Sequence, residues 1–266
     1  MVTADQQRPR SIPLATDSRR RGAHVAPLRR EAFAIVTELL RILHYLGGGV
    51  CHQLPGRSFL YAGQPLPVCA RCSGTFLGAL VAMLLIAISG RARACRWPQP
   101  IILALLSLFL LLWAGDGLNS YLTLFPAAPH LYEPSNTLRV ITGAFQGLAL
   151  VILLWPFMAG TFWRTPDDRP VLSPSGLAVA LAALAAIVAL VLWGQPGILL
   201  ATALLSAAGQ LALFALLNAL LLVVARQREA TLSHGRELAA YLAAGLIAGL
   251  VELTILSAIR HLILPW

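Results

Sequence analysis

Six apolar stretches dominate this 266-residue sequence, and each is long enough to cross a lipid bilayer. The hydrocarbon core of a bilayer is about 30 Å thick, and a helix of about 20 residues spans it. With 58% hydrophobic and 12% charged residues, the chain is too apolar for a water-soluble domain. The sequence therefore predicts an all-α, polytopic transmembrane helix bundle, with spans near residues 68–89, 98–115, 137–162, 175–193, 198–225 and 237–263.

A seventh apolar segment, 32–49, is interrupted by Glu38, Arg41 and His44. These polar residues also suit a helix that lies in the membrane interface. The arginines favour a spanning helix, because a cytoplasmic N-terminus then puts most of them on the cytoplasmic side, as the positive-inside rule requires. The outer side receives only Arg57, Arg71, Arg139 and Arg260. We expect about seven helices, a cytoplasmic N-terminus and a multi-pass location in the cell (inner) membrane.

The net charge of +9 follows this topology and does not indicate nucleic-acid binding. The chain divides into three parts by composition. Residues 1–31 form an arginine-rich tail that we expect to be disordered and cytoplasmic, and residues 32–163 hold nearly all the polar groups of the membrane domain. Residues 164–266 are rich in alanine and leucine, which predicts scaffold helices whose main partner is the lipid bilayer.

Three cysteines and one histidine carry the clearest chemical signal. Cys51-His52 is followed by the pair Cys69 and Cys72 in a Cys-x-x-Cys motif. Three thiols with one imidazole make a typical tetrahedral zinc set, and thiolates also suit another thiophilic ion such as Cu(I). The glycines at 47–49 would allow the sharp turn that two adjacent ligands need. We predict an extracytoplasmic metal site formed by these four residues, most simply a zinc site.

Thiol–disulfide exchange is the alternative reading of the same cysteines. Cys69 and Cys72 lie at the first turn of a predicted helix, where the helix dipole and Arg71 favour the thiolate form. Cys51 would then resolve the mixed disulfide, because Cys95 falls on the opposite membrane face. Inert packing of buried cysteines is the remaining interpretation.

Two polar loops fall on the same outer surface as the cysteines. They predict a polar pocket that either surrounds the metal or binds an anion such as a phosphate, a carboxylate or a lipid headgroup. The candidate partners of the protein are an anionic small molecule and another protein. The candidate residues of the pocket are Arg57, Arg71, Asp116, Asn119, Glu133, Asn136 and Arg139. The alternative is that Asp116 and Glu133 neutralise these arginines in structural ion pairs.

A third hypothesis, transport of a small ion or anionic solute, depends on polar residues inside the predicted spans. Charged groups are costly in a membrane and often line ion or proton paths. The candidates are Glu38, Arg41, His44, Gln146 and Glu252. A fixed ion pair of Glu38 with Arg41 or His44 explains the first three equally well. Gly74/Gly78, Gly143/Gly147 and Gly245/Gly249 predict close helix packing.

At these residues the chain resembles a family of small prokaryotic integral membrane proteins, a predicted-membrane-protein domain of unknown function. The family's signature is Cys-His-Gln, then Arg-Ser-Phe, then Pro-x-Cys-Ala-Arg-Cys before a glycine-rich helix start. It is matched here by Cys51-His52-Gln53, Arg57-Ser58-Phe59 and Pro67-Val68-Cys69-Ala70-Arg71-Cys72. A second block is matched by Asp116-Gly117, Asn136, Arg139 and Thr142-Gly143, with Asn119-Ser120 as a departure.

The resemblance covers roughly residues 40–150, and the apolar helices after Trp163 exceed the family's core. It implies that both polar blocks form one site, and it implies no substrate and no reaction. The sequence contains no nucleotide-binding glycine pattern, no Ser-His-Asp order and no His-Glu-x-x-His helix, so it does not indicate a particular enzymatic reaction.

Overall fold

The computed structural model describes residues 31, 34–125 and 128–263, and it confirms the predicted all-α helix bundle. Among these residues, six helices are long and apolar enough to cross a membrane. They are α2 (Ala70–Ile88), α3 (Pro100–Leu122), α4 (Asn136–Phe162), α5 (Pro174–Trp193), α6 (Pro196–Ala225) and α7 (Gly235–Ile263). Proline stands in the first turn of α3, α5 and α6, where a missing backbone N–H costs nothing.

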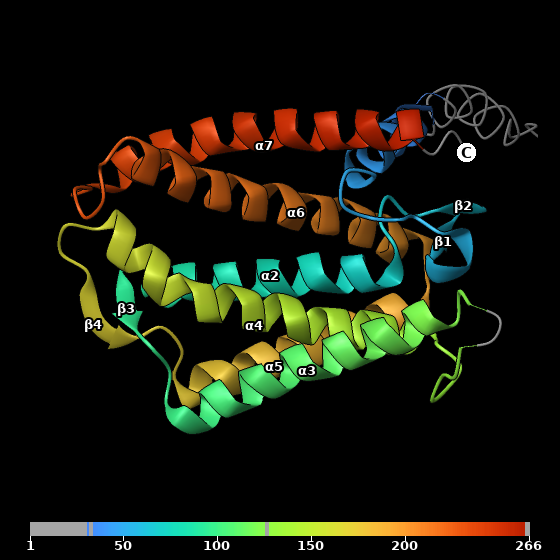
Figure 1. The fold of residues 1–266 in the computed structure, drawn as a ribbon, viewed down its shortest axis with the longest axis horizontal. Coiled ribbons are helices and arrows are strands. Elements are labelled where there is room, and N and C mark those ends of the chain that lie inside the picture. The colour runs from blue at the N-terminus through green and yellow to red at the C-terminus, as the bar shows by residue number, and fades with distance from the viewer. Residues whose placement is uncertain (1–30, 32–33, 126–127, 264–266) are drawn as a thin grey trace, which may run out of the picture. The chain divides into compact units, whose positions relative to one another are not determined.

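The chain divides into two units, residues 1–41 and 42–266. In the second unit, α2 and α4 share the most extensive contact. Helix α6 packs on α2, α7 packs on α6, and α3 packs on α4 (Figure 1). Helices α2 and α4 begin, and α3 ends, at the same end of this bundle. We call it the cysteine end, because Cys51, Cys69 and Cys72 lie there.

Helices α2 and α4 approach closely because each carries two glycines in their interface. A Cβ added at Gly74 or Gly78 of α2 would overlap the backbone of α4, and one at Gly143 or Gly147 would overlap the backbone of α2. Small residues four apart allow this contact between membrane helices. The close packing predicted for these glycines is confirmed, and it joins the first turns of α2 and α4.

Short elements close the two ends of the bundle. At the cysteine end, the 3₁₀ helix η1 (Pro55–Arg57) and a hairpin of β1 (Leu60–Tyr61) and β2 (Gln64–Pro65) fill the chain between Cys51 and α2. The hairpin turn has positive φ at both Ala62 and Gly63, as a two-residue type I′ turn requires. At the opposite end, β3 (Ala94–Arg96) pairs with β4 (Asp167–Pro170).

Residues 34–47 form a further helix. Its described part is shorter than the six long helices, so the spanning role predicted for 32–49 stays a prediction. Within the first unit, Glu38 and Arg41 form an exposed ion pair of 2.6 Å. This pair is the fixed ion pair that the sequence offered as one interpretation. Residues 1–30 of the predicted cytoplasmic tail, 1–31, lie outside the described residues.

Candidate metal centre and arginine cluster

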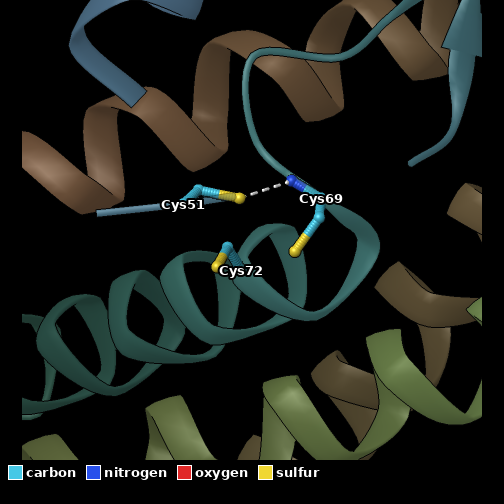
Figure 2. A group of neighbouring side chains, drawn as sticks. All are labelled: Cys51, Cys69 and Cys72. Atoms are coloured by element: carbon cyan, nitrogen blue, oxygen red, sulfur yellow. Dashed lines mark hydrogen bonds between the residues drawn. The ribbon is translucent and has the colours of Figure 1, made fainter. Parts of the chain in front are cut away.

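Three thiols meet at the cysteine end. The sulfurs of Cys51, Cys69 and Cys72 all lie within 4.8 Å of one another (Figure 2). Cys51 is buried in the loop before η1, Cys69 caps the N-terminus of α2, and Cys72 lies in its first turn. All three are free thiols. The chain thus brings cysteines from two segments into one group.

Backbone N–H groups point at the sulfur of Cys51. The N–H of Cys69 donates to it over 3.2 Å, and the N–H of Gln53 over 3.4 Å. Such bonds stabilise negative charge on sulfur, since hydrogen bonds to the charged form favour that form. Cys51 is therefore oriented with its sulfur toward α2 and the other two thiols.

Gln53 fixes the distance between the two cysteine segments. Its side-chain amide donates to the carbonyl of His44 and to that of Pro67, each over 2.6 Å, and its oxygen accepts from Arg260. Pro67 lies two residues before Cys69. Gln53 is itself buried and has a positive φ of 52°. One buried amide thus joins the Cys51 loop, the Cys69 loop and α7.

The last turns of α7 hold the same loop. Arg260 donates to the carbonyl oxygens of His52 (2.9 Å) and Gly48 (3.4 Å), and Ser257 donates to that of Tyr45 (2.6 Å). No pattern in the sequence predicts this role for Gln53 or Arg260. The glutamine of the Cys-His-Gln motif was the only local signal, and nothing in the sequence links it to an arginine some 200 residues later.

His52 does not join the group that it was predicted to complete. Among the described residues, the group contains the three cysteines alone, and the His52 side chain is exposed whereas Cys51 is buried. Cys51 and Gln53 on either side of it are buried, so His52 is the residue of this motif that faces outward. The predicted set of four ligands therefore reduces to three thiols in the structure.

Electrostatics limit the charge that this group holds by itself. The thiols of Cys51 and Cys72 donate to the sulfur of Cys69 and hold the pKa of Cys69 well below its usual range. The pKa of Cys51 is raised to about 11, chiefly because its thiol donates to Cys69. One thiolate thus suppresses ionisation of its neighbours. All three become thiolates only when a cation compensates them.

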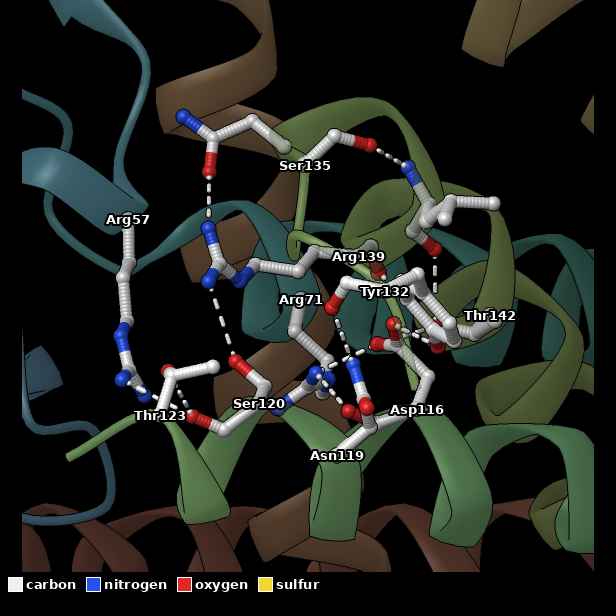
Figure 3. A network of polar contacts seen from close by, with 12 residues as sticks. Arg57, Arg71, Asp116, Asn119, Ser120, Thr123, Tyr132, Ser135, Arg139 and Thr142 are labelled. Carbon is white, nitrogen blue, oxygen red and sulfur yellow. Dashed lines mark hydrogen bonds and ion pairs between the residues drawn. The ribbon is translucent and has the colours of Figure 1, made fainter. Parts of the chain in front are cut away.

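A second polar group lies beside the first, centred on Asp116 of α3. Its carboxylate is buried and forms an ion pair with Arg71 of α2 (Figure 3). Tyr132 donates to Oδ1 over 2.9 Å, and the hydroxyl of Thr142 on α4 lies 3.2 Å from Oδ2. Asp116 therefore ties α2, α3, α4 and the loop after α3 together.

Two further arginines converge on Ser120, one turn along α3. Arg139 of α4 donates to the Ser120 hydroxyl over 3.0 Å and to Asn136 over 2.9 Å. Arg57 of η1 donates to the carbonyl of Ser120, also over 3.0 Å (Figure 3). We call Arg57, Arg71 and Arg139 the arginine cluster. Because it draws on η1, α2 and α4, it forms only when those elements have packed.

The other predicted pocket residues support this arrangement or lie away from it. Asn119 donates to the carbonyl of Tyr132 (2.9 Å) and accepts from the N–H of Leu131 (2.7 Å), which holds the loop over Asp116. Glu133 is exposed and pairs with His130 at 3.0 Å. Glu133 pairs with His130 and not with the arginine cluster, so of the predicted ion pairs the structure contains that of Asp116 with Arg71.

The candidates for a transport path occupy separate environments. Gln146 is buried within α4, and its side-chain oxygen has no hydrogen-bond partner. Glu252 is exposed on α7 and accepts a hydrogen bond from Asn218 of α6 (3.1 Å). His44 contributes its backbone carbonyl to the Gln53 contact. Within residues 42–266, the contacts of His44, Gln146 and Glu252 do not link these three residues into one group.

A family model described as a predicted membrane protein (DUF2085) matches residues 51–153. An uncharacterized protein of Methanocaldococcus jannaschii is 33% identical over 109 residues, which cover 40% of this chain but only 62% of that relative. An uncharacterized protein of Methanothermobacter thermautotrophicus is 32% identical over 104 residues, which cover 39% of this chain and 83% of the relative. No solved structure matches the chain significantly.

The matched region contains the three cysteines, Asp116 and the arginine cluster, and it ends within α4. Both polar groups therefore lie within the region that the family model matches, whereas Arg260 lies outside it. On this similarity, the chain belongs to the DUF2085 family of predicted membrane proteins.

Proposed function

We propose that Cys51, Cys69 and Cys72 bind one thiophilic metal ion, zinc in the first instance. The observation that carries this proposal is the mutual distance of their sulfurs, all within 4.8 Å. Zinc–sulfur bonds of about 2.3 Å in a tetrahedron place sulfurs about 3.8 Å apart. Small side-chain rotations therefore suffice to close the three sulfurs around one ion.

Three protein ligands leave the fourth position of a tetrahedral centre to water or to an exogenous group. A structural zinc site fills all four positions with side chains, whereas an open position is typical of sites that act on a ligand. With His52 turned outward, the described residues supply three ligands. The proposal is thus a metal centre open to exchange at one position.

We place this centre at the extracytoplasmic face of the inner membrane. The opposite end of the bundle is the more basic one, which supports a cytoplasmic assignment for it by the positive-inside rule. Its arginines are Arg91, Arg93, Arg96, Arg164, Arg169, Arg226, Arg228 and Arg236. Cysteine accessibility to a membrane-impermeant thiol reagent, applied to whole cells, tests this orientation.

Elemental analysis of the detergent-purified protein tests the metal. We expect about one metal ion per chain in the wild type and a loss of at least four fifths of it in Cys69→Ser and in Cys72→Ser, because two thiolates hold zinc far more weakly than three. Cys95→Ser is the matched control, since Cys95 lies at the opposite end beside Asp167. Wild-type protein without metal, or full metal content in both variants, would refute the proposal.

Thiol–disulfide exchange is the second candidate, and the lowered pKa of Cys69 favours it. The Cys69 thiolate would attack a substrate disulfide and release one substrate thiol. Cys72 or Cys51 would then displace the second, leaving a protein disulfide and a reduced substrate. A count of free thiols under non-reducing conditions separates the two candidates. Two of four thiols oxidised, with mixed disulfides trapped in Cys72→Ala, indicates exchange, and four free thiols with bound metal indicates the metal centre.

A further inference from the structure

We infer that Arg57, Arg71 and Arg139 form a binding site for a phosphate group at the cysteine end of the bundle. The first supporting observation is that the positive charges of the cluster outnumber the negative charges around it. Among the described residues, Asp116 is the carboxylate that forms an ion pair with this cluster. Three guanidinium groups thus face one carboxylate. Even with the nearby thiolate of Cys69 included, one positive charge stays uncompensated.

The excess charge is held where water screens it poorly. Arg139 has only 6% of its surface exposed, and Arg57 and Arg71 lie near enough for their charges to repel it. Bringing like charges together in a buried place is unfavourable unless a counter-charge joins them. A bound anion supplies that counter-charge without any further acidic residue.

The second observation is a pair of unused hydrogen-bond donors. The Nε atoms of Arg71 and Arg139 are buried and have no hydrogen-bond partner. The partners of these guanidiniums, Asp116, Asn136 and Ser120, contact only their Nη atoms. A buried N–H that lacks an acceptor destabilises a protein, so both donors call for an oxygen that the chain itself does not provide.

A phosphate group satisfies both observations. It carries several oxygens in different directions, and guanidinium groups bind it in a bidentate manner through adjacent N–H groups. Arg139 also lies in the first turn of α4, so the partial positive charge of the helix N-terminus adds to the attraction. Arg71 and Arg139 lie at the ends of helices long enough to span a membrane, so a phosphate group bound to them lies at the level of the lipid headgroups. Either a lipid headgroup or a soluble phosphate compound supplies this chemistry.

The test measures phosphate binding with the intact protein. The wild type in uncharged detergent is titrated with inorganic phosphate while its thermal midpoint is followed. In parallel, native mass spectrometry of protein from nanodiscs of phosphatidylcholine and phosphatidic acid reports retained lipid. A response to inorganic phosphate identifies a soluble ligand. Retained phosphatidic acid without that response identifies a headgroup, and both outcomes support the site. Binding of neither probe overturns it.

Two variants assign the binding to the cluster. Arg57→Gln removes a half-buried arginine from η1, and Arg139→Lys keeps the charge but removes the bidentate fork. Each is expected to weaken binding of the responding probe by about tenfold or more. Arg164→Gln, an exposed arginine at the opposite end, is the control and should bind as the wild type does. Wild-type affinity in both cluster variants, or equal weakening in the control, contradicts the inference.

The test of the phosphate site is independent of the test of the metal centre. Arg57 donates its hydrogen bond to Ser120 and not to any of the three cysteines. We therefore expect Arg57→Gln to have the metal content of the wild type. Loss of phosphate binding with full metal content supports two neighbouring sites. Loss of both together in Arg57→Gln shows instead that the variant disrupts the cysteine end, and it removes the case for a separate phosphate site.

Discussion

Replacing Gly147 by valine is expected to prevent α4 from packing against α2 and to destabilise the protein by about 3 kcal/mol or more. A Cβ at this position would overlap the backbone carbonyl of Thr75 and the amide of Ala79. Backbone atoms of a helix cannot move aside as a flexible side chain does, so the two helices must separate. The effect is measured by heating the protein in detergent and recording the temperature at which half of it is no longer monodisperse.

Gly160→Val is the matched control for this prediction. Gly160 also lies in α4, but it is exposed, and no atom of a neighbouring element lies within 4 Å of the position that its Cβ would take. We expect its thermal midpoint to stay close to that of the wild type, because substitutions of exposed positions typically change stability by about 0.5 kcal/mol or less. Equal midpoints for Gly147→Val and Gly160→Val would show that α2 and α4 do not touch through their glycines.

Asp116→Ala is expected to have the second largest effect, a loss of about 3–5 kcal/mol of stability. The substitution leaves Arg71 without its carboxylate and takes a partner from Tyr132 and from Thr142. It also removes the only carboxylate that pairs with the arginine cluster among the described residues. Thermal unfolding in detergent, compared with the wild type, measures the loss.

The control for Asp116 is an acidic residue with a weak, exposed partner. Asp168 lies 3.8 Å from Arg96 at the opposite end, and both side chains are exposed. Exposed ion pairs contribute about 0–1 kcal/mol, so Asp168→Ala should unfold near the wild-type temperature. Adding Arg71→Met to Asp116→Ala should restore part of the lost stability, because it removes the unpaired charge. A double variant no more stable than Asp116→Ala would assign the loss to something other than that charge.

The sequence predicted the six long helices because length and hydropathy are local properties. Among the predicted helix ends, that of α3 is the furthest from the structure: it was expected at residue 115 and lies at Leu122. Asp116, Asn119 and Ser120 ended the apolar run, yet all three are buried by contacts with α2, α4 and the loop after α3. A helix continues through polar residues when other helices supply their partners, and a hydropathy pattern contains no information about those partners.

The lack of information about distant partners also explains which parts of the cysteine group could be predicted from the sequence and which could not. Cysteines spaced as Cys69 and Cys72 meet across one helical turn, so spacing alone predicted part of the group. The direction of His52 depends on the backbone conformation at Cys51, which Gln53 and Arg260 set through distant contacts. The part of the chain expected to be scaffold therefore helps to shape the site, since Arg260 lies in it.

The hydrogen bonds from α7 to the Cys51 loop also have a consequence for the order in which the chain assembles during synthesis. A chain that has left the ribosome only as far as α6 already contains all three cysteines, but it lacks Ser257 and Arg260, which hold that loop. Cys51 is then held beside α2 by the Gln53 amide and the N–H of Cys69, without the contacts of α7. Packing of the final helix becomes the step that completes the support of the Cys51 loop, so this loop gains its full set of contacts last of all.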